Sequence, residues 1–567
     1  MNYLVSSEEE FFNIKKRNYI SIYTENFELF CLLKNQGIKY LFSKYLYKKS
    51  KNSDQIIDFF SKNWYLDNKN NDIFDLEKIS ISKSINRRLS IQFTYILRAY
   101  ISIQSVLKKK QSLKISSNSS KYLLLVSNVF KQVEIINFDI NKKSLFLSHS
   151  PDRARGFVPK TFLLGKLLRI LQKFFIKEKV IYFSDNTSVN SAKKNKQILI
   201  QNSKNIFNSF YFCENDFLFH KYQKLVSKII NNYDQNLIRK NIIKILNRFS
   251  IYNKSANDIS KIFLLLLKKE FNIQKKILIR SMSLYQDLFS FYKPKSVIQN
   301  GESGFDNILI AEFSRKNKIK NFLLIDGYQF FVDDFIFFKN KYKNQLSFNK
   351  VFAYGSSNEI IYLKQGFKKK QIIKINSPIL DKRININRNK FEQPLILGYQ
   401  PNLNCYQTPF DVQIKIELDL IRLLQDMEFK DIIIKLKHGD ERLNGIRIKT
   451  PIHYKKLFEN YFNKEMTINL NINSENLLEN FKKTKFVIGG FSTSIIEAIS
   501  SKVPYYFYEP IESGYKKKVL DTIELFDKDK IAVNLLSLKK NINSRNFIPF
   551  KMKNLAYSKS LHHFNFK

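Results

Sequence analysis

The chain has 567 residues, of which 44% are hydrophobic and 15% aromatic, so it is long and apolar enough for two or more domains with buried cores. Its formal net charge of +46 suggests a nucleic-acid-binding protein at first sight. The lysines are spread along the whole sequence, however, and it has neither zinc-finger spacing nor an RNA-binding aromatic motif. Lys, Asn, Ile, Phe and Tyr are enriched together, as in proteins of AT-rich genomes. We therefore expect anionic small molecules or a membrane surface as partners, and no nucleic acid.

The three cysteines (Cys31, Cys213 and Cys405) lie far apart, which predicts neither a disulfide framework nor a metal site. The N-terminus lacks the basic and then apolar segments of a signal peptide. The longest apolar runs, such as Ile262 to Leu267, are too short to span a bilayer. We expect a cytoplasmic protein that is able to rest on a membrane surface.

The N-terminal half has a mixed pattern. Two short strands are expected in the first forty residues, at YLVSS and YISIYTEN, with a helix-like segment between them. Residues 90–107 have helical spacing, Tyr122 to Ser127 is predicted as a strand, and residues 215–290 are predicted to be mainly helical. Residues 161–180 predict an amphipathic helix with lysines on one side, which favours an ordinary surface helix over a lipid-binding one.

From residue 296 onward, short apolar runs alternate with helical patterns. The first block predicts strands at residues 296–300, 321–327, 351–357 and 372–378, with helices at residues 305–317 and 358–366. After a polar stretch at residues 381–393, the second block predicts strands at residues 394–401, 431–440, 467–471, 486–490 and 503–510, with helices at residues 408–426, 474–484 and just after 493. Strands that alternate with helices of these lengths are typical of parallel sheets.

Two such blocks predict an α/β protein with two doubly wound Rossmann-like domains facing a cleft, and a helix-rich insertion in the N-terminal half. The polar stretch at residues 381–393 is the expected linker. We place the N-terminal domain at residues 1–385, the C-terminal domain at residues 386–540, and a tail able to pack back on the N-terminal domain at residues 541–567.

The C-terminal block contains the motif FVIGGFSTSIIEAISSKVPYYFYEP, residues 486–510. A strand is followed by two glycines, by Ser492, Thr493 and Ser494, and then by a short helix. On its own, Ser494-x-x-Glu497 is equally well explained as a capping box at a helix start. The alternative is a phosphate site, because hydroxyls and unpaired backbone N–H groups at a helix start favour an anion. A basic segment, KLKHG, lies about fifty residues upstream and favours the second interpretation.

These motifs resemble the donor half of GT-B-fold glycosyltransferases, and in particular the bacterial surface-carbohydrate sialyltransferases, polysialyltransferases and Kdo or glycerophosphate transferases. That family has a Lys-x-His-Pro type motif at a strand end, here Lys435, Lys437 and His438, with Gly439 in place of the usual proline. The family's later Ser/Thr-rich turn, Glu-Ala helix and Val-Pro strand correspond here to Ser492, Thr493, Ser494, Glu497, Ala498, Val503 and Pro504. The resemblance covers roughly the last 270 residues.

The resemblance implies that the C-terminal domain binds the sugar nucleotide and that the N-terminal domain holds the acceptor. The implied donor-binding residues are Lys435, Lys437, His438, Ser492, Thr493, Ser494 and Glu497. Asp326-Gly327 resembles the acidic-Gly motif that carries a general base, although Ile325 replaces the first acid and Asp-Gly is also a common turn. Glu302 is the reserve candidate for the catalytic base. The family implies no cofactor and no metal, since the sugar nucleotide is a substrate.

The expected function is therefore transfer of a sugar from a nucleotide-activated donor, of the CMP-linked sialic acid or Kdo type, to a cell-surface glycan or lipid-linked glycan. The resemblance implies surface polysaccharide synthesis, of capsule or lipopolysaccharide, at the inner face of the bacterial cytoplasmic membrane. One alternative is a CDP-glycerol-type phosphotransferase or a sugar-nucleotide epimerase on the same fold. The other is a non-enzymatic protein that binds polyanions at the membrane surface through its positive charge.

Overall fold

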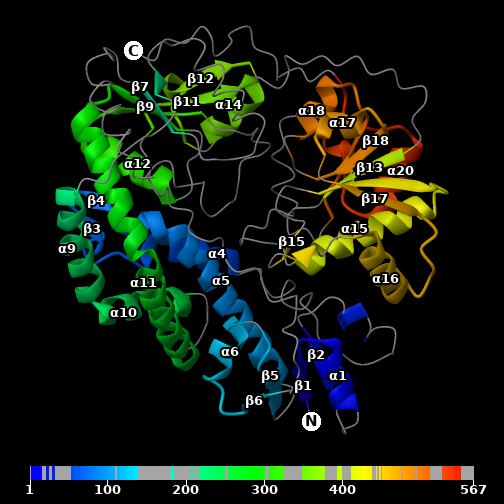
Figure 1. The fold of residues 1–567 in the computed structure, drawn as a ribbon, viewed down its shortest axis with the longest axis horizontal. Coiled ribbons are helices and arrows are strands. Elements are labelled where there is room, and N and C mark those ends of the chain that lie inside the picture. Colours follow the sequence, from blue (N-terminus) through cyan, green and yellow to red (C-terminus); the bar gives the residue numbers. More distant parts are fainter. Residues whose placement is uncertain are drawn as a thin grey trace.

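The structure is a computed structural model, shown in Figure 1. It describes residues 2–15, 21–24, 29–31, 33, 53–108, 112–119, 121–137, 180–183, 206–207, 216–248, 253–299, 305–324, 348–364, 366–376, 393–398, 410–436, 442–443, 446–447, 450–473, 475–490, 492, 494–510 and 527–550. Among these residues no helix is long and apolar enough to cross a bilayer.

The C-terminal block is a six-stranded sheet in which every neighbouring pair of strands is parallel. The strands stand in the spatial order β17 (Asn469–Asn473), β14 (Asp431–Lys435), β13 (Gln393–Leu397), β18 (Thr484–Gly489), β19 (Tyr505–Tyr508) and β20 (Ile531–Ala532). Numbered along the chain this is 3-2-1-4-5-6, the strand order of the Rossmann fold. The sequence predicted β13, β14, β17, β18 and β19 but not β20.

Helices cover both faces of this sheet, which explains its nearly continuous apolar strands. On one face, Ile432 and Ile434 pack in a cluster with helices α15 (Phe410–Gln425), α16 (Pro451–Phe462) and α20 (Leu535–Asn543). On the other face, Ile433 packs in a cluster with helices α17 (Leu477–Phe481) and α18 (Ser494–Ser500).

A second six-stranded parallel sheet occupies the middle of the chain. Its spatial order is β12 (Ile372–Ile375), β11 (Lys350–Tyr354), β10 (Lys320–Leu323), β9 (Ser296–Gln299), β7 (Val180–Phe183) and β8 (Ile206–Phe207). Helices α12 (Phe305–Lys316) and α14 (Gly355–Lys364) connect the later strands. Between β8 and β9 the chain forms the predicted helix-rich insertion, with α9 (Asp216–Asn232), α10 (Gln235–Arg248) and α11 (Asn253–Tyr292). The predicted fold class, two doubly wound sheets with a helical insertion, is confirmed.

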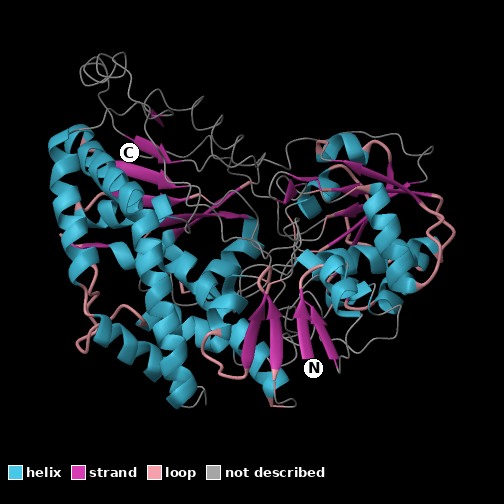
Figure 2. Ribbon diagram, turned by 60° about the horizontal axis from the view of Figure 1, so that its bottom comes forward, coloured by secondary structure: helices cyan, strands magenta, loops and turns pink. Residues whose placement is uncertain are grey.

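A third parallel sheet, which the sequence analysis did not predict, lies near the N-terminus (Figure 2). Its four strands stand in the order β2 (Ser21–Thr24), β1 (Asn2–Val5), β5 (Leu113–Ser116) and β6 (Val133–Ile136), which is 2-1-3-4 along the chain. Helix α1 (Glu8–Lys15) connects the predicted strands β1 and β2. This sheet unit lies beside the C-terminal unit: the ring of Phe30, which follows β2 in the chain, stands 6.1 Å from the ring of Tyr461 on α16, and the Lys456 ammonium on α16 lies 3.9 Å from the Glu8 carboxylate on α1.

The prediction of a strand at Tyr122 to Ser127 is wrong. The segment forms helix α6 (Lys121–Ser127), which packs on the long helix α5 (Ile81–Leu107). Tyr122, Leu123 and Val126 are buried, at positions that share one side of a helix. A short continuous apolar run fits a buried strand and a buried helix equally well, so periodicity alone could not distinguish them. The described residues also form helix α4 (Ser53–Asn63) and two short antiparallel ribbons, β3 (Asp75–Leu76) with β4 (Ile79–Ser80) and β15 (Arg442–Leu443) with β16 (Ile446–Arg447).

Candidate functional site

The strand order of the C-terminal sheet locates its switch point between β13 and β18. Strand β13 continues outward through β14 in one direction, whereas β18 is followed by β19 in the other. In doubly wound sheets, ligands bind beyond the carboxyl ends of the two strands on either side of this reversal. Here those ends are Leu397 and Gly489, so the Gly-Gly motif lies at the switch point itself.

Lys435 is the last residue of β14, directly opposite Leu397 on β13. Because side chains alternate along a strand, Lys435 shares the sheet face of Ile433, which is also the face covered by α18. Its ammonium donates to the carbonyl of Leu436 at 3.2 Å. A cation thus lies at the carboxyl edge, one strand away from the glycines.

The two glycines lie against the buried hydroxyl of Tyr505, the first residue of β19. The phenol donates to the carbonyl oxygen of Gly490 at 2.8 Å. A Cβ atom on Gly489 would lie 2.5 Å from the Tyr505 Oη and 3.1 Å from Leu397 Cδ1, so any larger residue would collide here. Close approach to a neighbouring side chain, together with the turn, explains the glycine at this position.

Burial is the main cause of a strongly raised pKa at Tyr505; the Glu509 carboxylate adds to the increase and the Ser494 hydroxyl opposes it. The phenol therefore stays protonated at neutral pH and keeps donating its proton to the turn. Tyr505 is a structural support of the motif and was not predicted from the sequence.

The helix start after the glycines differs from the predicted capping box. Helix α18 begins at Ser494, and its backbone N–H donates to the Oγ of Ser492 at 3.3 Å. Ser494 is 7% exposed, and its buried hydroxyl has no hydrogen bond of normal geometry to a described residue. Glu497 lies one turn further along the helix. Helix α18 has only seven residues and therefore few aligned peptide dipoles, so its dipole contributes little attraction for an anion. The hydrogen-bond donors at this edge are mainly the serine hydroxyls.

The remaining predicted site residues lie outside the described residues: Lys437, His438, Thr493, Asp326 and Glu302. The structure thus brings Lys435, Ser492, Ser494 and Glu497 to one edge of one sheet. Glu302 follows Gln299, the last residue of β9, by three positions in the sequence. Strand β9 stands next to β7 at the switch point of the middle sheet. The roles predicted for Lys437, His438, Thr493, Asp326 and Glu302 stay predictions.

Sequence reasoning missed a polar cluster at the switch point of the third sheet, between β1 and β5. The carboxylate of Glu10 is fully buried there and accepts from the Ser6 N–H at 2.7 Å. It also accepts from the Ser6 hydroxyl at 2.9 Å, the Ser116 hydroxyl at 2.7 Å and the Asn118 amide at 2.8 Å. The Glu10 N–H donates to the Ser7 hydroxyl at 3.2 Å. The sequence pattern Ser7-x-x-Glu10, which is typical of a helix start, could have indicated this cluster.

No protein-family model matches the chain, and no curated protein matches it either. Among the solved structures that resemble it is a UDP complex of S. aureus MnaA, with 10% identity and a TM-score of 0.36 over 65% of this chain and 87% of that one. Another is the UDP-GlcNAc 2-epimerase of Methanocaldococcus jannaschii, with 13% identity and a TM-score of 0.36 over 67% of this chain and 96% of that one. A third is the lipopolysaccharide outer core galactosyltransferase WaaB, with 11% identity and a TM-score of 0.30 over 64% of this chain and 88% of that one. Likenesses this weak transfer no activity to this chain.

Proposed function

We propose that this chain is a glycosyltransferase that binds a nucleotide-activated sugar at the carboxyl edge of its C-terminal sheet. The observation that carries the proposal is the strand order 3-2-1-4-5-6: the Gly-Gly turn and Ser494 follow β18 at the switch point, and Lys435 ends β14, one strand away at the same carboxyl edge. Glycines allow close approach of a ligand to the backbone, and the hydroxyl and the ammonium supply donors for a phosphate.

The proposed chemistry needs positive charge and hydrogen-bond donors where the nucleotide leaves. As the bond from the anomeric carbon to the phosphate oxygen breaks, negative charge accumulates on that phosphate. Lys435 and the serine hydroxyls would stabilise this charge, with Lys437, His438 and Thr493 as further candidates. The acceptor oxygen forms the new bond to the anomeric carbon and passes its proton to Asp326, or to Glu302 as the reserve base.

For the donor we propose a CMP-linked acidic sugar of the sialic acid or Kdo type, on the family resemblance of the Asp-Gly and Ser-Thr-Ser motifs. The acceptor would be a glycan or lipid-linked glycan of the bacterial surface, reached from the cytoplasmic side of the membrane. The net charge of +46 suits both an anionic donor and an anionic membrane surface.

A thermal-shift panel tests the donor site. CMP, CDP, UDP and GDP are added to the full chain and to two variants, Lys435→Gln and His438→Ala. A ligand that binds only the folded state raises the melting temperature by mass action, so one nucleotide should stabilise the wild type. We expect a smaller shift in both variants. Lys430→Gln is the matched control, because Lys430 is exposed just before the opposite, amino end of β14 and should leave the shift unchanged.

The panel, together with an activity assay on a sugar nucleotide, separates the alternatives. A polyanion-binding protein would respond to every anion alike, with strong dependence on salt and none on Lys435. A sugar-nucleotide epimerase would convert its substrate without any acceptor, whereas the proposed transferase would leave the sugar nucleotide unchanged until an acceptor glycan is added. The absence of any nucleotide-dependent shift would overturn the proposed donor site.

A further inference from the structure

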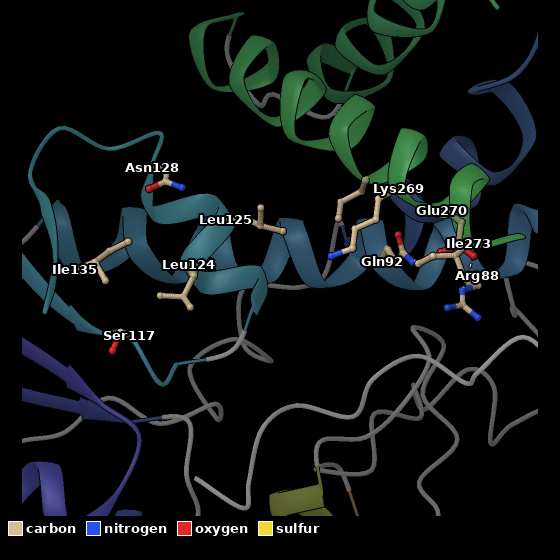
Figure 3. A pocket seen from close by; sticks show the side chains of 11 residues that line it. Arg88, Gln92, Ser117, Leu124, Leu125, Asn128, Ile135, Lys269, Glu270 and Ile273 are labelled. Atoms are coloured by element: carbon tan, nitrogen blue, oxygen red, sulfur yellow. Dashed lines mark hydrogen bonds and ion pairs between the residues drawn. The ribbon is translucent and has the colours of Figure 1, made fainter. Parts of the chain in front are cut away.

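A pocket lies between the helical insertion and the third sheet, apart from the proposed donor site (Figure 3). Its volume is about 360 Å³, within the usual size range of small-molecule sites. Helices α5, α6 and α11 form its walls, and Ser117 and Ile135 bring it to the carboxyl ends of β5 and β6. That is the edge of a parallel sheet at which ligands bind.

The polar wall of the pocket is built around the carboxylate of Glu270, which is 1% exposed. Arg88 approaches it to 2.5 Å, and the side-chain amides of Gln92 and Gln274 donate to it at 2.8 and 2.9 Å. The carboxylate is therefore satisfied, and its charge is balanced by the guanidinium of Arg88.

The hydrogen bond to Glu270 fixes the orientation of the Gln92 amide, because a carboxylate accepts and only the amide nitrogen can donate to it. Its carbonyl oxygen Oε1 consequently faces away from Glu270; it is buried and has no hydrogen-bond partner among the described residues. Gln92 is 5% exposed and lines the pocket. A buried acceptor without a partner is unfavourable, so the pocket is suited to a ligand that donates an O–H or N–H at this point.

The rest of the lining is cationic on one side and apolar on the other. Lys269 is exposed on α11, and its ammonium forms no ion pair within the described part of the chain, so it offers a positive charge to an anionic ligand. The apolar side chains are Leu124, Leu125, Ile135, Leu266 and Ile273. Two of them, Ile135 and Ile273, are 43% and 49% exposed, which leaves apolar surface for a ligand to cover.

We propose that this pocket binds a lipid monophosphate, that is, an alkyl or isoprenyl chain carrying a phosphate. The chain would cover the leucine and isoleucine side chains, an anionic phosphate oxygen would face Lys269, and the protonated phosphate oxygen would donate to Gln92 Oε1. The proposal is independent of the donor site and would stand if the chain bound no nucleotide at all.

Isothermal titration of the full chain with decyl phosphate below its micellar concentration tests the proposal. We expect saturable binding of one molecule, weaker binding of neutral decyl glucoside, and weaker binding still of inorganic phosphate. Lys269→Gln should weaken decyl phosphate binding about two- to five-fold and leave decyl glucoside unchanged. Lys268→Gln is the matched control, because it removes the same charge one residue away from the pocket lining.

A second pair of variants tests the apolar wall. Leu125→Ser should weaken both alkyl probes, whereas Leu265→Ser, at a residue that is 63% exposed outside the lining, should weaken neither. Flotation with phosphatidylcholine vesicles, with and without phosphatidate, distinguishes a membrane headgroup from a free lipid phosphate as the source of the ligand. Absence of saturable binding would overturn the proposal. Equal losses of decyl phosphate affinity in Lys268→Gln and Lys269→Gln would also overturn it, because they would indicate diffuse attraction by the net charge.

Discussion

The switch points of the third sheet and of the C-terminal sheet are occupied in different ways. Between β1 and β5, the carboxylate of Glu10 accepts hydrogen bonds from Ser6, Ser116 and Asn118, so donors at this edge are satisfied by the chain itself. Between β13 and β18, two glycines lie over Tyr505, and the buried Ser494 hydroxyl has no hydrogen bond of normal geometry to a described residue.

Strand order alone therefore identifies a possible binding edge but does not establish a site. At the third sheet, an internal carboxylate held by several donors occupies the position that an anion would need. At the C-terminal sheet, the glycine turn, the Ser494 hydroxyl and the Lys435 ammonium present donors at an edge where no described carboxylate is bound. This contrast supports the proposal that the switch point of the third sheet stabilises the fold and that the switch point of the C-terminal sheet is the nucleotide site.

The largest expected effect is that of Glu10→Ala. The substitution leaves the buried donors of Ser6, Ser116 and Asn118 without their acceptor, so the local free energy of unfolding should fall by about 3 kcal/mol. Hydrogen exchange of the amides in β1 and β5 measures this quantity. Glu9→Ala, at an exposed position on the same helix, should change it little. If Glu10→Ala abolished nucleotide binding as well, the proposed division of roles between the two edges would be wrong.

Gly489→Ala should lower the free energy of unfolding by about 2 kcal/mol, because the new methyl group collides with the Tyr505 hydroxyl and with Leu397. Chemical denaturation measures the change. Adding Tyr505→Phe removes the closer of the two contacts, so the double variant should recover part of the loss. Strictly additive losses would show that the Tyr505 hydroxyl does not limit the space at Gly489.

Tyr505→Phe alone removes one buried hydrogen bond to the Gly490 carbonyl and should lower the free energy of unfolding by about 1 kcal/mol. Because that bond holds the turn, nucleotide affinity should fall as well, as measured by isothermal titration. Tyr506→Phe is the matched control: its hydroxyl bonds to Ile542 at 3.4 Å on the opposite face of the sheet. Equal effects of the two substitutions on affinity would contradict a role for Tyr505 in the site.

Ser494→Ala should have the smallest effect on stability, within about 0.5 kcal/mol, since the hydroxyl lacks a normally formed hydrogen bond to lose. Its effect on nucleotide affinity should be about ten-fold, the size expected for one hydrogen bond to a charged phosphate. Thermal denaturation and titration of the same sample give both values. A variant that lost stability but kept its affinity would make Ser494 a structural residue.

The sequence predicted nine of the twelve strands of the two larger sheets, because these strands are short apolar runs separated by helices, such as the run that ends at Lys435. It did not predict β7 and β8 of the middle sheet or β20 of the C-terminal sheet. It did not predict the third sheet, because β1 and β5 pair across more than a hundred residues of intervening chain. The segment Tyr122 to Ser127, which contains a five-residue apolar run, was predicted as a strand, whereas packing on α5 makes it part of a helix.

For the candidate site, the residue types could be predicted but their placement could not. Lys435 and Ser494 stand on strands and helices whose neighbours are set by strand order, which spacing in the sequence does not reveal. Tyr505 was unpredictable because its contact with Gly490 depends on two parallel strands lying side by side. Asp326 and Glu302 stay predictions from the family resemblance.

Hydrogen–deuterium exchange of the full chain, with and without millimolar CMP or UDP, tests the central claim most directly. The account predicts that one of these nucleotides slows exchange in peptides covering residues 393–398 and 486–500, at the switch point of the C-terminal sheet. Peptides covering residues 2–10 and 113–118, at the edge that Glu10 fills, should exchange at unchanged rates. Unchanged exchange at residues 486–500 with both nucleotides, or equal protection at both edges, would contradict it.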